Sequence, residues 1–195
     1  MRKQRYPLRN IRTLLERSQG QVGWAYSIWF LLLMGLLLCA SLQVQSFRTT
    51  GRYVEDALAC SNLAALIVDV EEYGRSHEIL LESPTAARDR FLTALRGNLN
   101  LDLNMRCPND SLISGPVNID AFIVYQVYED RVEIFRFGPE GGEVYFTGIP
   151  GEIFAPNGKP VTNTGVYSEI SFPVKGFLGV ETEVHKGDLA DIAVN

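Results

Sequence analysis

Residues 22–42 contain no charged side chain, and this run restricts the fold of the chain more than any other feature of its sequence. In a helix, about 20 apolar residues, each rising about 1.5 Å, cross the hydrocarbon layer of a bilayer, which is about 30 Å thick. The run therefore predicts one transmembrane helix, to which we assign residues 21–42.

Basic residues crowd the N-terminal side of this run. Six of the first 17 residues are Lys or Arg and one is acidic, whereas the rest of the chain has 12 basic and 22 acidic residues. Because an excess of Lys and Arg on a short flank keeps that flank in the cytoplasm, we expect a cytoplasmic basic flank at residues 1–20 and a single-pass protein of the cell membrane. Everything after residue 42 is then extracellular. An acidic body also argues against nucleic acid as a partner, since binding to phosphates requires a basic surface.

A cleaved signal peptide is the alternative to a permanent anchor. Its apolar stretch usually has 7–15 residues and ends at a small-x-small cleavage site. The nearest such site, Leu38-Cys39-Ala40, has a bulky leucine in the first small position. The long span and this poor site favour an anchor that is retained.

Two helical segments are expected after the span, in residues 43–97. Apolar residues recur at helical spacing up to residue 70, which predicts an amphipathic stalk that continues the membrane helix and ends near Gly74. Ser83 and Pro84 suit the N-cap and first turn of a second helix, which should reach about Arg96 and end at Gly97. The recurring apolar residues of the stalk are Val54, Leu58, Leu63, Leu66, Ile67 and Val70.

The remaining residues, 98–195, change to the two-residue period of strands. Alternating apolar residues occur in five short stretches, at 117–127, 131–137, 143–149, 170–174 and 178–184. Turn residues such as Pro156-Asn157-Gly158 separate them, and short connections join antiparallel neighbours. We therefore expect an α+β fold: a single N-terminal transmembrane helix that continues into an amphipathic helix, a second helix, and a mainly antiparallel sheet of about five strands packed on the helices.

No residue pattern indicates an enzyme. The sequence has no Gly-Lys-Ser/Thr phosphate loop, no Gly-x-Ser-x-Gly and no Gly-x-Gly-x-x-Gly motif after a strand. The two histidines, His77 and His185, lack a second histidine or a cysteine at metal-ligand spacing, so we interpret both as surface residues. Carboxylate pairs such as Glu71-Glu72 are interpreted as solvated surface. We expect no catalytic residue, metal, cofactor or small-molecule substrate.

The cysteines leave two alternatives open. Cys39 lies in the membrane span, whereas Cys60 and Cys107 lie on the side where disulfides persist. A Cys60–Cys107 bridge would close a loop of roughly 47 residues and contribute about 4 kcal/mol in the chain-entropy model. The alternative is that the two cysteines are not bridged and that Cys60 is buried.

The order of these parts is informative: a basic leader, Gly20, an apolar helix, an amphipathic continuation and a helix-plus-sheet head. It resembles the minor pilins and pseudopilins of bacterial type IV-like systems, most nearly the TadE-like proteins of tight-adherence pilus loci in Firmicutes. In that family a peptidase cuts after a glycine, so the resemblance implies cleavage between Gly20 and Gln21. Tyr26 matches the family's aromatic residue, and Ala25 stands at the position of its glutamate.

The resemblance implies a non-catalytic, membrane-anchored component of a pilus or type IV-like secretion apparatus. Such a subunit would assemble with other pilin-like subunits through its N-terminal helix. Helices in lipid associate at small residues, and the span offers Gly23, Ser27, Gly35 and Ala40 for such packing. The alternative function is a stand-alone, signal-anchored binding domain at the cell surface.

Overall fold

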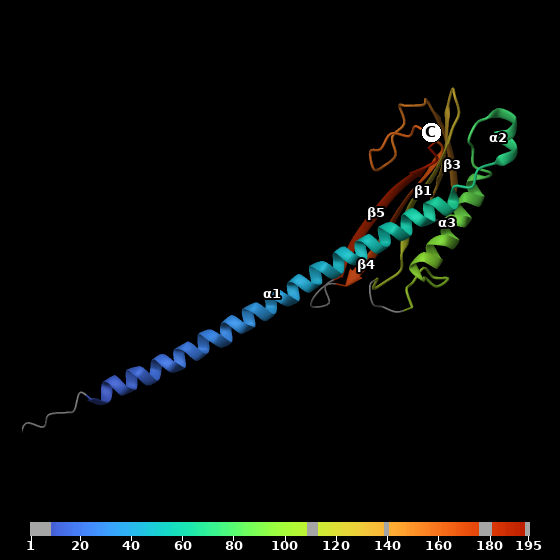
Figure 1. Ribbon diagram of the computed structural model, residues 1–195. Helices are drawn as coiled ribbons and strands as arrows, with labels where there is room; N and C mark the ends of the chain where they lie inside the picture. Colours follow the sequence, from blue (N-terminus) through green and yellow to red (C-terminus); the bar gives the residue numbers. More distant parts are fainter. Residues whose placement is uncertain (1–8, 109–112, 139–140, 176–180, 194–195) are drawn as a thin grey trace, which may run out of the picture. The chain divides into compact units, whose positions relative to one another are not determined.

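The computed structural model describes residues 9–108, 113–138, 141–175 and 181–193. The chain divides into two compact units, Met1–Ser46 and Phe47–Asn195. The first unit contains the N-terminal part of helix α1 (Arg9–Ala65), and the second contains the rest of α1 and all the other elements (Figure 1). The boundary lies four residues beyond the expected end of the membrane span at residue 42.

Helix α1 continues past the apolar segment as expected, but it ends at Ala65 and not near Gly74. The carboxylate of Asp69 causes this difference. Its Oδ1 accepts hydrogen bonds from the backbone N–H groups of Glu71 and Glu72, each at 3.0 Å, and so caps a separate helix, α2 (Val70–Ser76). The apolar face predicted for the stalk is correct at Val54 and Leu58, which are buried. It is wrong at three residues that are exposed, Leu63, Ile67 and Val70.

Helix α3 (Pro84–Leu99) is the predicted second helix. Ser83 is its N-cap, because the Ser83 Oγ accepts a hydrogen bond from the N–H of Ala86. The helix extends beyond the expected end at Gly97 and ends at Leu99. Asn100 adopts a left-handed conformation with φ 51° and provides the C-cap, which lets the buried Leu99 belong to the helix.

Among the described residues, five strands form one sheet, and every neighbouring pair is antiparallel, so the predicted sheet is confirmed. The spatial order is β3-β2-β1-β4-β5. The last two strands are longer than their apolar alternation indicated, and residues 176–180 between them lie outside the described residues. The strands are β1 (Asn118–Val127), β2 (Val132–Phe137), β3 (Glu143–Gly148), β4 (Gly165–Lys175) and β5 (Glu181–Asp191).

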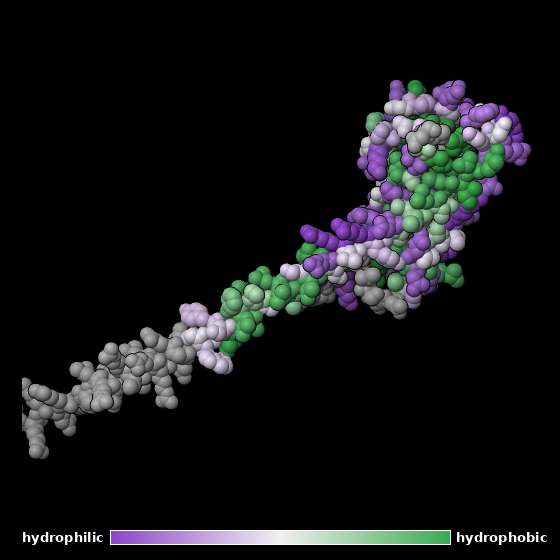
Figure 2. Space-filling view, in the orientation of Figure 1, coloured by the Kyte–Doolittle hydropathy of each residue, from purple (hydrophilic) through white to green (hydrophobic). Residues whose placement is uncertain are grey.

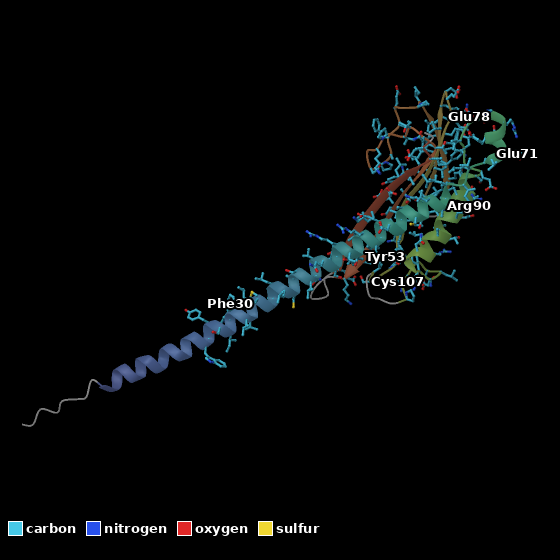
Figure 3. The ribbon with its side chains drawn as sticks, in the orientation of Figure 1. Phe30, Tyr53, Glu71, Glu78, Arg90 and Cys107 are labelled. Atoms are coloured by element: carbon cyan, nitrogen blue, oxygen red, sulfur yellow. The ribbon has the colours of Figure 1, made fainter. Side chains whose placement is uncertain are left out.

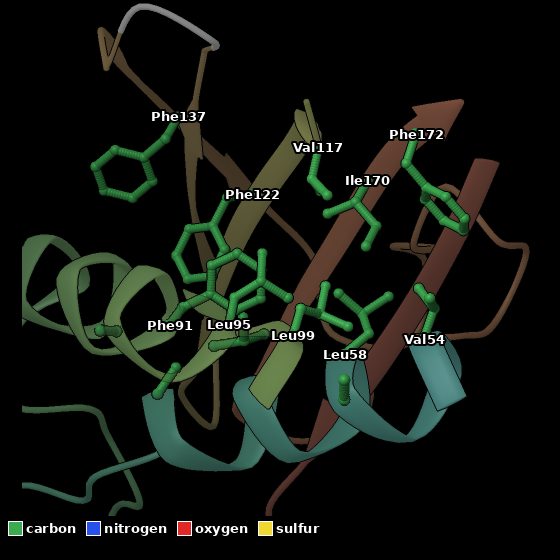
Figure 4. Close-up of a cluster of buried hydrophobic side chains, with 14 of the residues drawn as sticks. Val54, Leu58, Phe91, Leu95, Leu99, Val117, Phe122, Phe137, Ile170 and Phe172 are labelled. Carbon is green, nitrogen blue, oxygen red and sulfur yellow. The ribbon is translucent and has the colours of Figure 1, made fainter. Parts of the chain in front are cut away.

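The C-terminal part of α1 and helix α3 cover one face of this sheet, and the large core lies between them (Figure 4). Burial of each large apolar side chain contributes roughly 1.5–3 kcal/mol, so this layer is the main source of stability in the head. We call residues 47–195 the head. The largest core side chains are Val54 and Leu58 from α1, Phe91 and Leu95 from α3, and Phe122, Ile170 and Phe172 from β1 and β4.

Buried polar side chains fix the position of α1 on the sheet. Asn62 is fully buried, and its Oδ1 accepts a hydrogen bond from the Ser168 Oγ at 2.6 Å. Its Nδ2 donates to the backbone oxygen of Asp188 at 3.2 Å. An unpartnered buried amide costs about 1–3 kcal/mol, so these bonds select one register of α1 against β4 and β5.

The other face of the sheet carries a second, smaller core that the sequence did not predict. Residues 149–164 fold back over this face and bury Ala155 and Val161 against Ile123, Tyr125 and Tyr167. Burial raises the pKa of Tyr125 to about 12. The predicted turn at residues 156–158 is confirmed within this segment. The part of the face near Asp120 lies outside this second core.

Phe172 offers a direct test of the large core. Its side chain is 1% exposed, so Phe172→Ala should lower the free energy of unfolding by about 3–5 kcal/mol. Pulse proteolysis of the full chain in detergent over a urea series measures the change. Phe154→Ala is the matched control, because Phe154 is 62% exposed and should cost less than about 1 kcal/mol. Equal losses in the two variants would contradict this packing.

Candidate functional site

The apolar segment of α1 presents its side chains outward on all sides. Every residue from Gly23 to Leu42 is exposed, and Trp24 and Trp29 are 74% and 72% exposed. Figure 2 shows most of this segment in green, and Phe30 projects from the helix in Figure 3. Among the described residues, this is the one helix whose length and composition would let it cross a membrane, as an anchor or as a signal sequence.

The small residues of this segment do not form one stripe. Gly23 and Ser27 are four residues apart and share a face, and the Ser27 Oγ donates a hydrogen bond to the Gly23 carbonyl oxygen at 3.0 Å. At about 100° per residue, Gly35 and Ala40 point well away from that face, in different directions. A Cβ added at Gly23 or Gly35 would meet no other atom of the described chain within 4 Å. Of these four residues, only Gly23 and Ser27 therefore share a face of the helix.

The predicted cleavage site lies in the helical backbone of α1. Gly20 and Gln21 are both within Arg9–Ala65, and the structure describes only the backbone at these two residues. Cleavage between them stays a prediction of the resemblance.

The predicted Cys60–Cys107 disulfide is not formed in the described structure. Cys60 is exposed on α1, on the opposite side of the helix from Val54 and Leu58. Cys107 is half-buried and packs against the large core from the loop after α3 (Figure 3). The two side chains therefore point to different sides of the head. The expectation of a buried Cys60 is also wrong, because the helix turns this residue to solvent.

Most of the acidic pairs are solvated, as interpreted. Glu71 and Glu72 lie in the first turn of α2 and pair with Arg75 at 3.6 and 3.2 Å on an exposed surface. His77 is exposed at the end of α2 and packs beside Tyr73, with 6.1 Å between the ring centroids. These residues lie on the exposed surface, as the sequence indicated.

His185 is exposed as predicted, but carboxylates from two other strands surround it. On β5 it lies directly opposite Ser171 of β4, and Glu169 is on the same face two residues before Ser171. A β-bulge between Ile119 and Ala121 places Asp120 of β1 on this face too. Three strands thus bring Asp120, Glu169 and His185 together.

Hydrogen bonds orient the members of this cluster. The Ser171 Oγ donates to Asp120 Oδ1 at 2.9 Å, while Asp120 Oδ2 lies 3.2 Å from His185 Nδ1. The Tyr167 hydroxyl donates to Glu169 Oε2 at 3.1 Å. Burial and this hydrogen bond raise the pKa of Tyr167, which keeps its hydroxyl protonated as a donor.

The cluster borders an open pocket of about 480 Å³. Asp120, Ser171 and His185 line it together with Glu183, the next residue of β5 on the same face. The ligand atoms of Asp120, Glu169 and His185 all lie within 4.8 Å of one another. Sequence spacing could not reveal this cluster, because its members come from three strands and depend on the bulge.

Two features of the molecule thus remain as candidates for function: the exposed helical segment and the cluster of Asp120, Glu169 and His185. No family model, curated protein or solved structure matches the chain.

The state of the cysteines can be tested on the protein purified without reductant. We expect alkylation without reductant, followed by peptide mapping, to recover Cys60 and Cys107 in separate modified peptides, because the two side chains point to different sides of the head. Cys60 should react before the head is unfolded, and Cys107 more slowly because it is half-buried. A single linked fragment that contains both residues would show that the two cysteines form a disulfide and would contradict this expectation.

Proposed function

We propose that this chain is a non-enzymatic, single-pass membrane protein of a bacterial pilus or type IV-like secretion apparatus. In this proposal the N-terminal part of α1 anchors the protein and packs against other pilin-like subunits, and the head lies outside the cell. One observation carries it: α1 is uncharged and exposed from Gly23 to Leu42, yet the same helix supplies Val54, Leu58 and Asn62 to the core of the head.

Lipid or a partner helix is the natural environment for the exposed segment. Soluble proteins rarely leave contiguous apolar patches larger than a few hundred Å² in water, and this segment is apolar around its whole circumference. The basic residues before it fit a cytoplasmic flank at the headgroups. The combination of this segment with an amphipathic half that packs on an antiparallel sheet agrees with the pilin-like layout inferred from the sequence.

The head also offers a surface for neighbouring subunits. Strand β3 is at one edge of the sheet, and Val144, Tyr145 and Phe146 in it are each about half exposed. Exposed edge strands with apolar side chains tend to pair with other chains unless charge or proline blocks them. Ile149 and Phe154 add further exposed apolar area beyond this strand. These residues support contacts between heads in an assembly.

An anchored binding domain is the second candidate, and the cluster at His185 favours it. A polar group built from three strands beside an open pocket is a feature that a recognition module would use. The two functions differ in what they require of the membrane helix. Assembly requires its particular side chains, whereas a binding domain requires only a tether.

Replacing residues 21–42 by an unrelated membrane span should separate the two functions. For an assembly subunit, the chimera should be exported with a folded head but should no longer co-purify with its partners. Within the native span, Gly23→Leu should weaken assembly because it fills the face shared with Ser27, and Leu37→Ile is the volume-matched control. Unchanged co-purification and surface structure in the chimera would favour the binding domain.

The orientation can be checked with single cysteines in a background in which Cys39, Cys60 and Cys107 are serine. A cysteine at Glu152, an exposed residue of the head, should react with an impermeant maleimide on intact cells. A cysteine at Ser18 should react only after permeabilisation, because the basic flank stays in the cytoplasm. The reverse labelling pattern would exclude the proposed topology.

A further inference from the structure

We propose that Asp120, Glu169 and His185 form a binding site for a divalent transition-metal ion and that Zn²⁺ is the ion that fits it best. One imidazole nitrogen and two carboxylate oxygens are a donor set that zinc accepts, with water in the remaining position. Calcium and magnesium prefer oxygen ligands alone, so the histidine argues against both. The site is independent of the membrane segment and of the proposed assembly function.

The distances suit a small ion. Zinc bonds of about 2.0–2.2 Å in a tetrahedral shell separate neighbouring ligand atoms by about 3.4 Å. His185 Nδ1 and Asp120 Oδ2 are already 3.2 Å apart, and the three ligand atoms lie within 4.8 Å of one another. The ligand atoms therefore have to approach one another by at most about 1.4 Å to complete the set.

The neighbouring hydroxyl groups hold the carboxylates in the orientation that a metal needs. Ser171 donates to one oxygen of Asp120, and this leaves the other oxygen facing His185. Tyr167 donates to Glu169 Oε2, and this leaves Oε1 for a ligand bond. Hydrogen-bond donors that orient the ligands in this way are typical of metal sites.

The backbone supports the same arrangement. The bulge turns Asp120 onto the face of His185, and bulges often redirect a side chain next to a functional site. Gly187 lies opposite Glu169 on β5, and a Cβ there would collide with the Tyr167 hydroxyl, so glycine leaves room for the tyrosine that holds Glu169.

Charge at the cluster also favours a cation. Asp120 and Glu169 are two carboxylates close together, and Glu183 adds a third at the adjoining pocket. An alternative without metal is a surface ion pair, in which a protonated His185 contacts Asp120 and Glu169 has no role.

Zinc binding to the full-length chain in detergent tests the proposal. All variants carry serine in place of Cys39, Cys60 and Cys107, because thiolates bind zinc themselves. At pH 7.5 we expect one Zn²⁺ per chain by calorimetry. Affinity should fall more than about tenfold in His185→Gln, Asp120→Asn and Glu169→Gln, and about tenfold in the positioning variant Ser171→Ala. Excess Ca²⁺ should not displace the zinc.

Two matched controls separate a built site from general attraction to an acidic surface. His77→Gln removes the other histidine, and Glu152→Gln removes an exposed carboxylate outside the cluster; both should bind zinc as the parent does. In the parent, zinc should shift the imidazole ¹⁵N resonances of His185 and leave those of His77 in place, a readout that needs no substitution. Failure to bind zinc, retention of binding in His185→Gln, or displacement by Ca²⁺ would each overturn the proposal.

Discussion

Helix α1 is one continuous helix with an exposed apolar segment and a C-terminal part that is buried in the head. The rest of the structure depends on where the exposed segment ends and the buried part begins. From Gly23 to Leu42 its side chains are uncharged and exposed, whereas Val54, Leu58 and Asn62 are buried in the head. The Asn62 amide fixes the helix on the sheet through Ser168 and the backbone of Asp188. A hydrophobic contact alone would allow the helix to slide or rotate, but a buried amide loses its partners when it moves.

The two faces of the sheet then acquire different roles. The helices close one face with the large core, and residues 149–164 cover only part of the other. The uncovered part is where polar side chains can gather without a desolvation cost, and the bulge at Asp120 brings a carboxylate to it. The cluster at His185 is thus a consequence of incomplete cover on one face together with one extra residue in β1.

Most of what the sequence predicted correctly rests on periodicity, and most of what it missed rests on single side chains. The apolar run, the second helix and the five antiparallel strands follow from spacings of 3.6 and 2 residues. The predicted end of α1 was wrong because the Asp69 side chain caps a new helix. For the cysteines the sequence left two alternatives open, and neither anticipated that the phase of α1 turns Cys60 to solvent. The cluster at His185 could not be predicted, since a one-residue change of register would turn Asp120 to the other face.

The connection between the apolar segment and the head bears on the choice between assembly and tethering. A tethered binding domain gains from a flexible linker, which is usually rich in Gly, Ser or Pro and lets the domain search for its ligand. Residues 43–53 contain one glycine, one serine and no proline, and they are helical. Thr50 and Val54 are buried in the head, so little chain remains between the end of the span and the core. In the proposed assembly function, a head core built on the continuation of the apolar segment suits a subunit that assembles through its helix better than a domain that searches for its ligand on a flexible linker.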